Sequence, residues 1–295
     1  MQTLILTACF AILPAAAVFA DCGGHGDSNT MLVTPSWLAA HIEDPNLAIL
    51  AIGDSKQYAH AHIPGSAMVE MQEIATRGDL TLELPPMDAL ASTFGKKGVS
   101  DDSRIILYMT KDQTTQTTRV YLTLDAMGFG AHTSILDGGL LAWQSEGHAV
   151  TDEVPAIKPG KVTPCPQSDV IASFDYVRTH LNQAGMHLVD ARDTQYYTGA
   201  SASRNRAGHI PGASSIPFSS LTDEQGKLKP TDALRRQFVA AGVAANDHLV
   251  TYCHIGQQAT LLYFVARYLG YDVQLYDGSW EEWARHPELP VEMVK

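Results

Sequence analysis

The chain has 295 residues, of which 45% are hydrophobic and 18% are charged, and its formal net charge is −12. This length and composition fit two globular domains of ordinary size. The acidic balance argues against non-specific binding to nucleic acid, because the phosphate backbone would be repelled. A local binding site for a small anion stays compatible with this net negative charge.

The first twenty residues have the pattern of an export signal. Leu4 to Leu13 is apolar apart from one threonine, and residues 18–20 form a small-residue cleavage site. A signal peptide over 1–20 predicts a periplasmic or secreted protein, although its start carries no Lys or Arg. A disordered or membrane-tethered N-terminus is the alternative, and a lipoprotein anchored through Cys22 is a minor one. No other stretch approaches the length of a membrane span, so we expect no membrane segment in the mature form.

Helices and short strands alternate through the first half. The apolar pattern predicts a helix over Pro35–Ile42, strands at Leu47–Ile52 and Ala67–Glu70 around a His-Ile-Pro-Gly turn, and a helix over Pro86–Phe94. A buried strand at Ile105–Tyr108, a helix that ends at Gly128 and a strand at Thr133–Leu136 follow, the last leading into an Asp-Gly turn and a Trp-bearing helix. Such alternation predicts an α/β fold with a parallel sheet.

The second half repeats the same order. Its helices are predicted at Phe174–Ala184, Thr231–Ala241 and Thr260–Leu269, and its strands at His187–Ala191, Ser214–Pro217, His248–Tyr252 and Val273–Tyr276. The His-Ile-Pro-Gly turn of 62–65 recurs at 209–212, and the Asp-Gly turn of 137–138 recurs at 277–278. Repeated markers at a nearly constant spacing indicate two homologous domains. We place them at 31–150 and 169–295, joined by a linker over 151–168 that holds four prolines.

Cys253 ends the apolar strand of the second copy. The loop after it consists of His254, Ile255, Gly256, Gln257, Gln258 and Ala259, and a helical pattern follows. Backbone N–H groups of such a loop, with the positive end of a helix behind them, form an anion cradle. A thiol in that cradle loses its proton more readily, and the thiolate is the nucleophile. The alternative is a buried cysteine that only packs at the end of a core strand.

The other cysteines and the histidines predict no further site. Cys9 would leave with the signal, and Cys22 and Cys165 could form a disulfide in an oxidising compartment, a pairing that the sequence leaves open. No CxxC motif occurs, and the close histidine pairs complete no metal site. No nucleotide or flavin signature is present either. We therefore expect neither a metal nor a cofactor.

The two copies resemble tandem rhodanese sulfurtransferases in their His-Ile-Pro-Gly turns, their cysteine loop and the Asp-Gly-Gly-x-x-x-Trp segment of 137–143. The resemblance covers residues 31–292 and implies two rhodanese-like domains, each with a mainly parallel central sheet flanked by helices. In that family the second domain carries the reactive cysteine and the first has lost it. Here Met109 stands at the position that matches Cys253. The resemblance therefore implies an inactive first domain that walls one side of the site, with two independent modules as the alternative.

The resemblance also implies a supporting pair at the end of a neighbouring strand. Asp190 and Arg192 match family positions that organise the pocket wall, and the first copy has Ala51 and Gly53 there instead. A purely structural salt bridge explains this pair at least as well as substrate contact. Arg204, with Arg206 nearby, fits a mobile, solvated loop better than an anion site.

Two-step sulfur transfer is the reaction that the resemblance implies. The Cys253 thiolate would take a sulfur from a small anionic donor such as thiosulfate, and the resulting persulfide would pass it to cyanide or a thiol. Backbone N–H groups of residues 254–259 would stabilise the charge. Family members that use thiosulfate often have a cation in the loop, and members that use mercaptopyruvate tend to have a Gly-Ser-Gly run, but this loop has neither. His254 is either a partly protonated group that attracts the anion or a simple loop residue.

Two other functions stay open at this point. A cysteine-dependent phosphatase needs an arginine six positions after the cysteine, and Ala259 stands there. A persulfide carrier or binding protein of the cell envelope would share the same cysteine chemistry with negligible turnover. The sequence leaves open the physiological donor, the acceptor and the oligomeric state.

Overall fold

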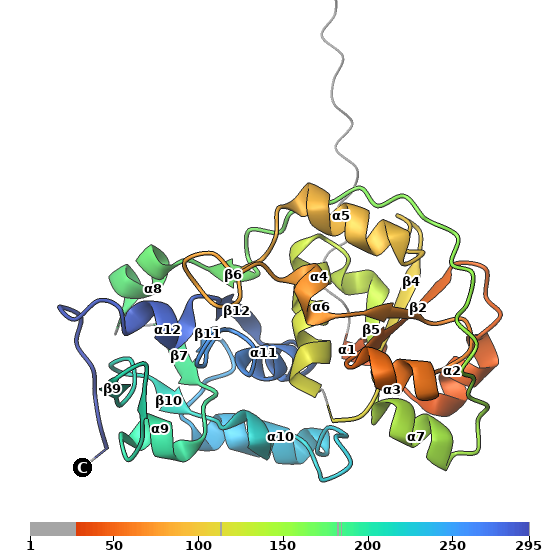
Figure 1. Cartoon of the computed structure of the whole chain (residues 1–295). Coiled ribbons are helices and arrows are strands. Elements are labelled where there is room, and N and C mark those ends of the chain that lie inside the picture. The colour runs from red at the N-terminus through yellow and green to blue at the C-terminus, as the bar shows by residue number, and fades with distance from the viewer. Residues whose placement is uncertain (1–27, 113, 182, 184, 295) are drawn as a thin grey trace, which may run out of the picture.

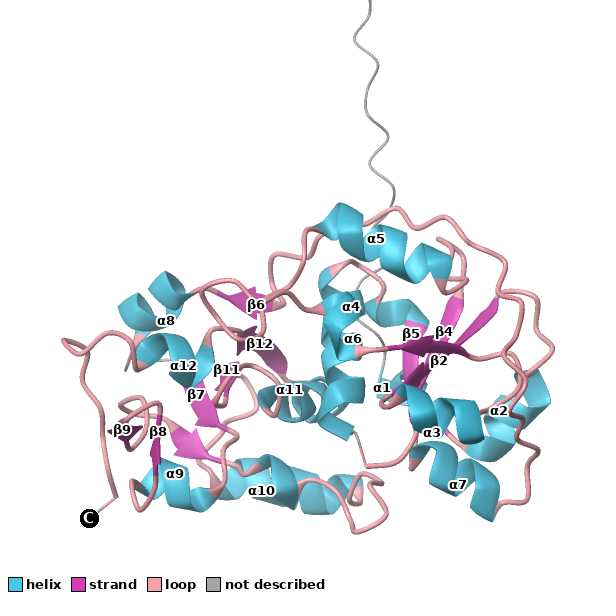
Figure 2. Cartoon of the chain, viewed as in Figure 1, coloured by secondary structure: helices cyan, strands magenta, loops and turns pink. Residues whose placement is uncertain are grey.

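The computed structural model describes residues 28–112, 114–181, 183 and 185–294 (Figure 1). The predicted signal over 1–20 and Cys22 lie outside the described residues. Two parallel sheets, each flanked by helices, make up this part of the chain (Figure 2). The predicted α/β fold with two similar domains is confirmed.

The first domain is built on a five-stranded sheet of order β1-β5-β4-β2-β3. Its strands are β1 (Leu32–Val33), β2 (Leu47–Ile52), β3 (Ala67–Val69), β4 (Arg104–Met109) and β5 (Thr133–Leu136). Its helices are α1 (Ser28–Met31), α2 (Pro35–His41), α3 (Ser55–His60), α4 (Met71–Ile74), α5 (Met87–Lys96), α6 (Thr114–Ala126) and α7 (Gly139–Ser145), with a 3-10 turn η1 (Gly130–His132).

The second domain repeats this sheet with the order β10-β7-β11-β12-β6. Its strands are β6 (Ile171–Ala172), β7 (Met186–Asp190), β10 (Ser214–Ser215), β11 (His248–Tyr252) and β12 (Asp272–Tyr276). Its helices are α8 (Phe174–His180), α9 (Thr194–Thr198), α10 (Thr231–Ala240), α11 (Ala259–Tyr268) and α12 (Ser279–Trp283), with a 3-10 turn η2 (Phe218–Ser220). A small antiparallel hairpin is added by β8 (Ala202–Ser203) and β9 (Arg206–Ala207).

Equivalent residues stabilise both copies. The Tyr108 and Tyr252 hydroxyls each accept a hydrogen bond at 3.1 Å from a His-Ile-Pro-Gly turn, from the N–H groups of Ile63 and Ile210. These turns tie the end of a central strand to the neighbouring loop in both domains. Their presence in both copies agrees with a structural role.

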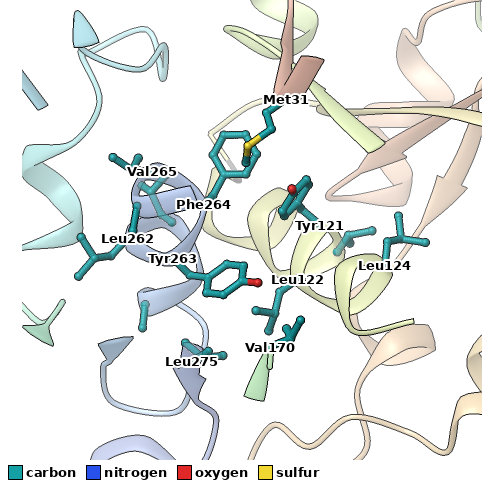
Figure 3. Close-up of a cluster of buried hydrophobic side chains, with 14 of the residues drawn as sticks. Met31, Tyr121, Leu122, Leu124, Val170, Leu262, Tyr263, Phe264, Val265 and Leu275 are labelled. Carbon is teal, nitrogen blue, oxygen red and sulfur yellow. The ribbon is translucent and has the colours of Figure 1, made fainter. Parts of the chain in front are cut away.

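The two domains pack through α6 and α11. Figure 3 shows Tyr121 on α6 facing Tyr263 and Phe264 on α11, and the Tyr121 ring meets the Phe264 ring edge-on at 4.8 Å. The Tyr263 hydroxyl donates to the buried Asp125 carboxylate of the first domain at 2.6 Å. One hydrophobic cluster includes side chains of both sheets, so the two domains share a core. Burial of this kind opposes independent motion of the domains.

The linker over 151–168 lies along the surface of the first domain (Figure 1). Gly160 donates to the Gly95 carbonyl at 2.9 Å, and Cys165 donates to the Met127 carbonyl at 2.8 Å. Cys165 is disulfide-bonded. The predicted partner, Cys22, falls outside the described residues. Within the described part of the chain, no helix combines the length and hydropathy that crossing a bilayer requires.

Local differences from the expected elements lie in the loops around both sheets. The helix expected up to Ala184 ends at His180, and the sequence pattern did not reveal α3, α9 or the β8–β9 hairpin. The hairpin turns at Arg204 and Asn205, both with positive φ of 53° and 61°. Asparagine tolerates this conformation better than most residues, but arginine has no such preference, so no sequence signal marked the turn.

Candidate functional site

Cys253 follows the last residue of β11, at the carboxyl edge of the second sheet. Its N–H donates to the Ser279 hydroxyl at 3.1 Å, and its carbonyl accepts from the Trp280 N–H at 3.0 Å. Ser279 has a φ of 52°, and its hydroxyl donates in turn to the Tyr276 carbonyl at 2.8 Å. The Asp-Gly turn before α12 thus fixes the backbone of the cysteine from the next strand.

The loop after Cys253 curls around the sulfur. The backbone N–H groups of Ile255, Gly256, Gln258 and Ala259 donate toward the thiol. Gly256 has a φ of +79°, and a Cβ there would lie 2.5 Å from the Asp277 carbonyl oxygen. The loop can close only because this position has no side chain.

The thiol does not have the lowered pKa expected from its loop. Cys253 is 0% exposed. Burial raises the pKa of Cys253, and the four converging N–H groups lower it by less. Removal of water from around a thiolate costs more than these amides return in the closed site. The expectation that the cradle alone favours the thiolate is therefore wrong for this conformation.

Asp190 and Arg192 form a buried ion pair beside the cysteine. Both side chains are fully buried, with Arg192 Nη2 2.6 Å from Asp190 Oδ2. Arg192 also donates to the Gly208 carbonyl at 2.7 Å, and its guanidinium lies 4.4 Å from the centre of the Trp280 ring. Burial lowers the pKa of Arg192, but Asp190, Tyr252 and Cys253 raise it by more, so the group stays cationic. The pair connects the end of β7 to the Gly208 carbonyl and also places a positive charge near the sulfur.

His254 is neutral. Burial, and then the charge of Arg192, lower the pKa of His254 to about 4. Its Nδ1 is 2.8 Å from the Ser203 hydroxyl, and its ring meets Tyr196 edge-on at 4.5 Å. An imidazole with this pKa carries no charge at neutral pH, so the interpretation of His254 as an anion-attracting cation is wrong.

Arg204 and Arg206 lie on an exposed hairpin, in keeping with the exposed loop that the sequence suggested, but both guanidinium groups have fixed partners. Arg204 donates to the Thr81 hydroxyl of the first domain and pairs with Glu281 on α12, each at 3.0 Å. Glu281 also accepts the Thr81 N–H at 3.0 Å. Arg206 donates to two main-chain carbonyls near the C-terminus of the chain. The loop after α4 therefore reaches the second domain and is fastened there, as its course in Figure 1 shows.

The first domain also contacts the cysteine loop itself, through residues that the sequence did not single out. The Gln257 amide donates to the Thr115 hydroxyl at 3.3 Å, and the Thr118 and Thr260 hydroxyls are 2.7 Å apart. Arg119 is fully buried and donates to the Gly256 carbonyl at 3.2 Å. One signal was available: a single basic residue in a helical pattern whose one other charged residue is Asp125.

Met109 occupies the position in the first domain that matches the cysteine. A Cβ on Gly139, which corresponds to Ser279, would lie 2.5 Å from the Met109 side chain. The Thr114 hydroxyl lies 3.1 Å from the Met109 sulfur. A thioether has no ionisable proton, so the matching position offers no thiolate. Among the described residues, no group of three metal-ligating side chains is present.

Comparisons with known proteins agree on one family. A model of the rhodanese-like domain matches residues 34–146 and 173–286. A thiosulfate sulfurtransferase from Azotobacter vinelandii is 30% identical over 89% of this chain and 97% of its own length. The sulfur carrier protein TtuD from Thermus thermophilus is 29% identical over 88% of this chain and 96% of its own length.

A solved structure gives the same result. SseA from Escherichia coli, described as a 3-mercaptopyruvate sulfotransferase with the rhodanese fold, is 27% identical and superposes with a TM-score of 0.77. The match covers 85% of this chain and 99% of that chain. The two domain matches together span most of the described residues. The chain therefore belongs to the rhodanese-like domain family, with two copies of the domain in tandem.

Proposed function

We propose that this protein is a sulfurtransferase in which Cys253 carries the transferred sulfur as a persulfide. The observation that carries the proposal is the convergence of four loop N–H groups on one thiol at the carboxyl edge of a parallel sheet. Fixed donors of this kind stabilise an anion without reorganising during the reaction. The names of the relatives, a thiosulfate sulfurtransferase and a 3-mercaptopyruvate sulfotransferase, support the same chemistry.

The reaction has two balanced steps. The Cys253 thiolate attacks the outer sulfur of thiosulfate, the S–S bond of the donor breaks, and sulfite leaves with the bonding electron pair. A thiophilic acceptor, cyanide or a thiolate, then attacks the terminal sulfur of the persulfide, and the Cys253 thiolate is released. The terminal sulfur is anionic in the persulfide, and the loop amides face it. No general base acts in this scheme except on the resting thiol.

The residues around the sulfur favour a small, compact donor. Arg192 supplies a fixed positive charge near the thiol, whereas His254 is neutral and the loop itself has no Lys or Arg. Cys253 is fully buried in this conformation, so a donor reaches the sulfur only after the residues that surround it move. Thiosulfate needs less space than a donor with a carbon skeleton. We therefore place thiosulfate ahead of mercaptopyruvate as the donor.

The deciding experiment is intact-mass spectrometry after brief treatment with each donor. Wild-type protein should gain one sulfur atom, and Cys253→Ser should gain none. Thiosulfate and mercaptopyruvate are compared at equal concentration, with cyanide discharge of the added sulfur as the second readout. A sulfur found on another cysteine, or none on the wild type with any donor, would reject Cys253 as the carrier of the transferred sulfur.

A persulfide carrier is the second candidate, and two observations favour it. One relative is named a sulfur carrier protein, and Cys253 is fully buried. A carrier would load one sulfur per chain and release it slowly without a partner. Steady-state production of thiocyanate from thiosulfate and cyanide separates the two candidates. Many turnovers per chain support the enzyme, and a single stoichiometric burst supports the carrier.

We also propose that the protein acts outside the cytoplasm, in the periplasm or as a secreted protein. The apolar start of the sequence supports this, and so does the disulfide bond at Cys165, because disulfides persist in oxidising compartments. The mass of the protein recovered from the cell envelope should correspond to a chain that starts at Asp21. A full-length mass, or a lipid-modified Cys22, would reject cleavage before Asp21.

A further inference from the structure

Arg119 is the charged side chain by which the first domain contacts the cysteine loop, among the residues that the structure describes. It lies on α6, is fully buried, and forms a two-point ion pair with Asp277 of the second domain. The same guanidinium donates to the Gly256 carbonyl at 3.2 Å. One side chain therefore links α6, the Asp-Gly turn before α12 and the loop around the sulfur.

Arg119 contacts the loop at Gly256, the residue whose positive φ allows the loop to curl around the sulfur. Gly256 has a φ of +79°, and its N–H is one of the four that donate toward the thiol. Its carbonyl, on the next peptide plane, is the group that Arg119 binds. Because neighbouring peptide planes share a Cα, fixing this carbonyl restricts the rotation that would turn the amides away from the sulfur.

Stability alone explains Arg119 poorly. Arg119 is fully buried while Asp277 is 18% exposed, and removing a guanidinium from water costs several kcal/mol, which its attraction to the carboxylate often only offsets. The Nε of Arg119 is buried without a hydrogen-bond partner, and this adds to the cost. An apolar pair of the same volume would stabilise the domain interface as well. A fold that keeps the charged pair at this place gains the fixed loop.

We propose that Arg119 is a positioning residue for sulfur transfer: the first domain, which has methionine at the position of the nucleophile, sets the direction of the amides on Cys253 through this side chain. The inference rests on the proposed function, since it assigns a role in that reaction. In this proposal the first domain does more than cover one side of the site: it orients the loop amides through Arg119, which does not contact the substrate.

The test uses three variants of the full chain. Arg119→Met removes the guanidinium at similar volume, Arg119→Lys keeps the charge without the planar fork, and Arg119→Met with Asp277→Asn removes both charges. The matched control is Arg267→Met, which removes a second interdomain arginine, 3.9 Å from Asp125, away from the loop. Each protein is assayed for sulfur uptake by intact mass in a single turnover, for iodoacetamide alkylation across pH, and for unfolding in denaturant.

Misdirected amides stabilise the thiolate less, so Arg119→Met should slow sulfur uptake at least about tenfold, which corresponds to the lower end of the free energy of one charged hydrogen bond. Its alkylation should move to higher pH. The double variant should recover stability but not the uptake rate, Arg119→Lys should recover part of the rate, and Arg267→Met should change stability alone. Wild-type rate and pH dependence in the double variant, or a pH shift equally large in Arg267→Met, would overturn the inference.

Alkylation keeps the two proposals apart. It reports the state of the Cys253 thiol without any sulfur donor. A wild type that is alkylated but takes up no sulfur contradicts the proposed function, whereas the shift in Arg119→Met still decides the role of the arginine. If Arg119→Met does not fold, the double variant and Arg119→Lys carry the same comparison.

Discussion

Replacement of Ser279 separates two opposing effects on stability: the hydrogen bonds of its hydroxyl, which stabilise the Cys253 backbone, and its positive φ, which is unfavourable. Its hydroxyl accepts the Cys253 N–H at 3.1 Å and donates to the Tyr276 carbonyl at 2.8 Å, and the residue is fully buried. Its φ of 52° is unfavourable for any residue with a side chain. The first domain has Gly139 at the matching position, with a φ of 55°. Ser279→Ala and Ser279→Gly form a matched pair that tests the hydroxyl and the backbone separately.

The expected magnitudes follow from these contacts. Ser279→Ala leaves the Cys253 N–H buried without an acceptor, which costs about 1–3 kcal/mol of unfolding free energy. Ser279→Gly loses the same bond but relieves a left-handed conformation worth roughly 1–2 kcal/mol, from which the backbone entropy of glycine subtracts about 0.5–1 kcal/mol. Ser279→Gly should therefore be more stable than Ser279→Ala by roughly 0.5–1 kcal/mol, and less stable than wild type.

Denaturant unfolding measures the three stabilities, and the single-turnover mass assay follows the chemistry. Both variants should take up sulfur more slowly than wild type, because the backbone of the cysteine is no longer fixed from the Asp-Gly turn. Ser279→Ala with wild-type stability would show that the hydroxyl contributes nothing. Ser279→Gly less stable than Ser279→Ala would refute the assignment of the backbone conformation.

Three further predictions concern the geometry of the cysteine loop, the pH dependence of sulfur uptake and the ion pair between Arg204 and Glu281. Gly256→Ala places a Cβ 2.5 Å from the Asp277 carbonyl oxygen at a φ of +79°, so it should lower the unfolding free energy by about 1–3 kcal/mol and abolish sulfur uptake; normal uptake would contradict the loop geometry. Burial raises the pKa of the thiol, and the pKa of His254 is about 4, so the uptake rate should rise with pH through neutrality without an inflection from the histidine. An inflection near neutral pH that His254→Asn removes would show the opposite. Arg204→Met removes the ion pair with Glu281. Because Arg204 is 46% exposed, this pair contributes at most about 1 kcal/mol, so alkylation of the thiol should accelerate by about twofold to fivefold. An unchanged rate would contradict a role of this ion pair in limiting access to the thiol.

The sequence predicted the features that local patterns encode. The strand from His248 to Tyr252 is continuous and apolar because both faces of a parallel sheet are covered by helices. The cysteine, a glycine at the third position of the loop and a helix after it predicted the curled loop, since that order brings several N–H groups to one point. The two copies strengthened each inference, because a pattern seen twice is unlikely to be accidental.

Features that arise between segments far apart in the chain were not predictable. Arg119 contacts the loop from a helix of the other domain, and Thr81 meets Glu281 across the same boundary. The pKa directions expected for Cys253 and His254 were wrong for the same reason. Burial is the largest cause of both pKa shifts, and the burial of these side chains depends on the residues that surround them in the fold. A loop sequence gives the donors of a cradle, but the surrounding fold decides how much water it keeps.

Comparison of the two copies shows that few residues distinguish the domain that has the thiol from the domain that has methionine in its place. The tyrosine that fixes the His-Ile-Pro-Gly turn is present in both, whereas Met109 and Gly139 stand in place of Cys253 and Ser279. The interface is asymmetric at one further position: Arg119 matches Tyr263, and each reaches a carboxylate of the opposite domain. Only the arginine also binds a loop next to a thiol, because only the second domain has one. The first copy, which has no nucleophile at this position, instead contacts the cysteine loop of the second. Variants at the contacts between α6 and that loop therefore test whether the first domain supports sulfur transfer.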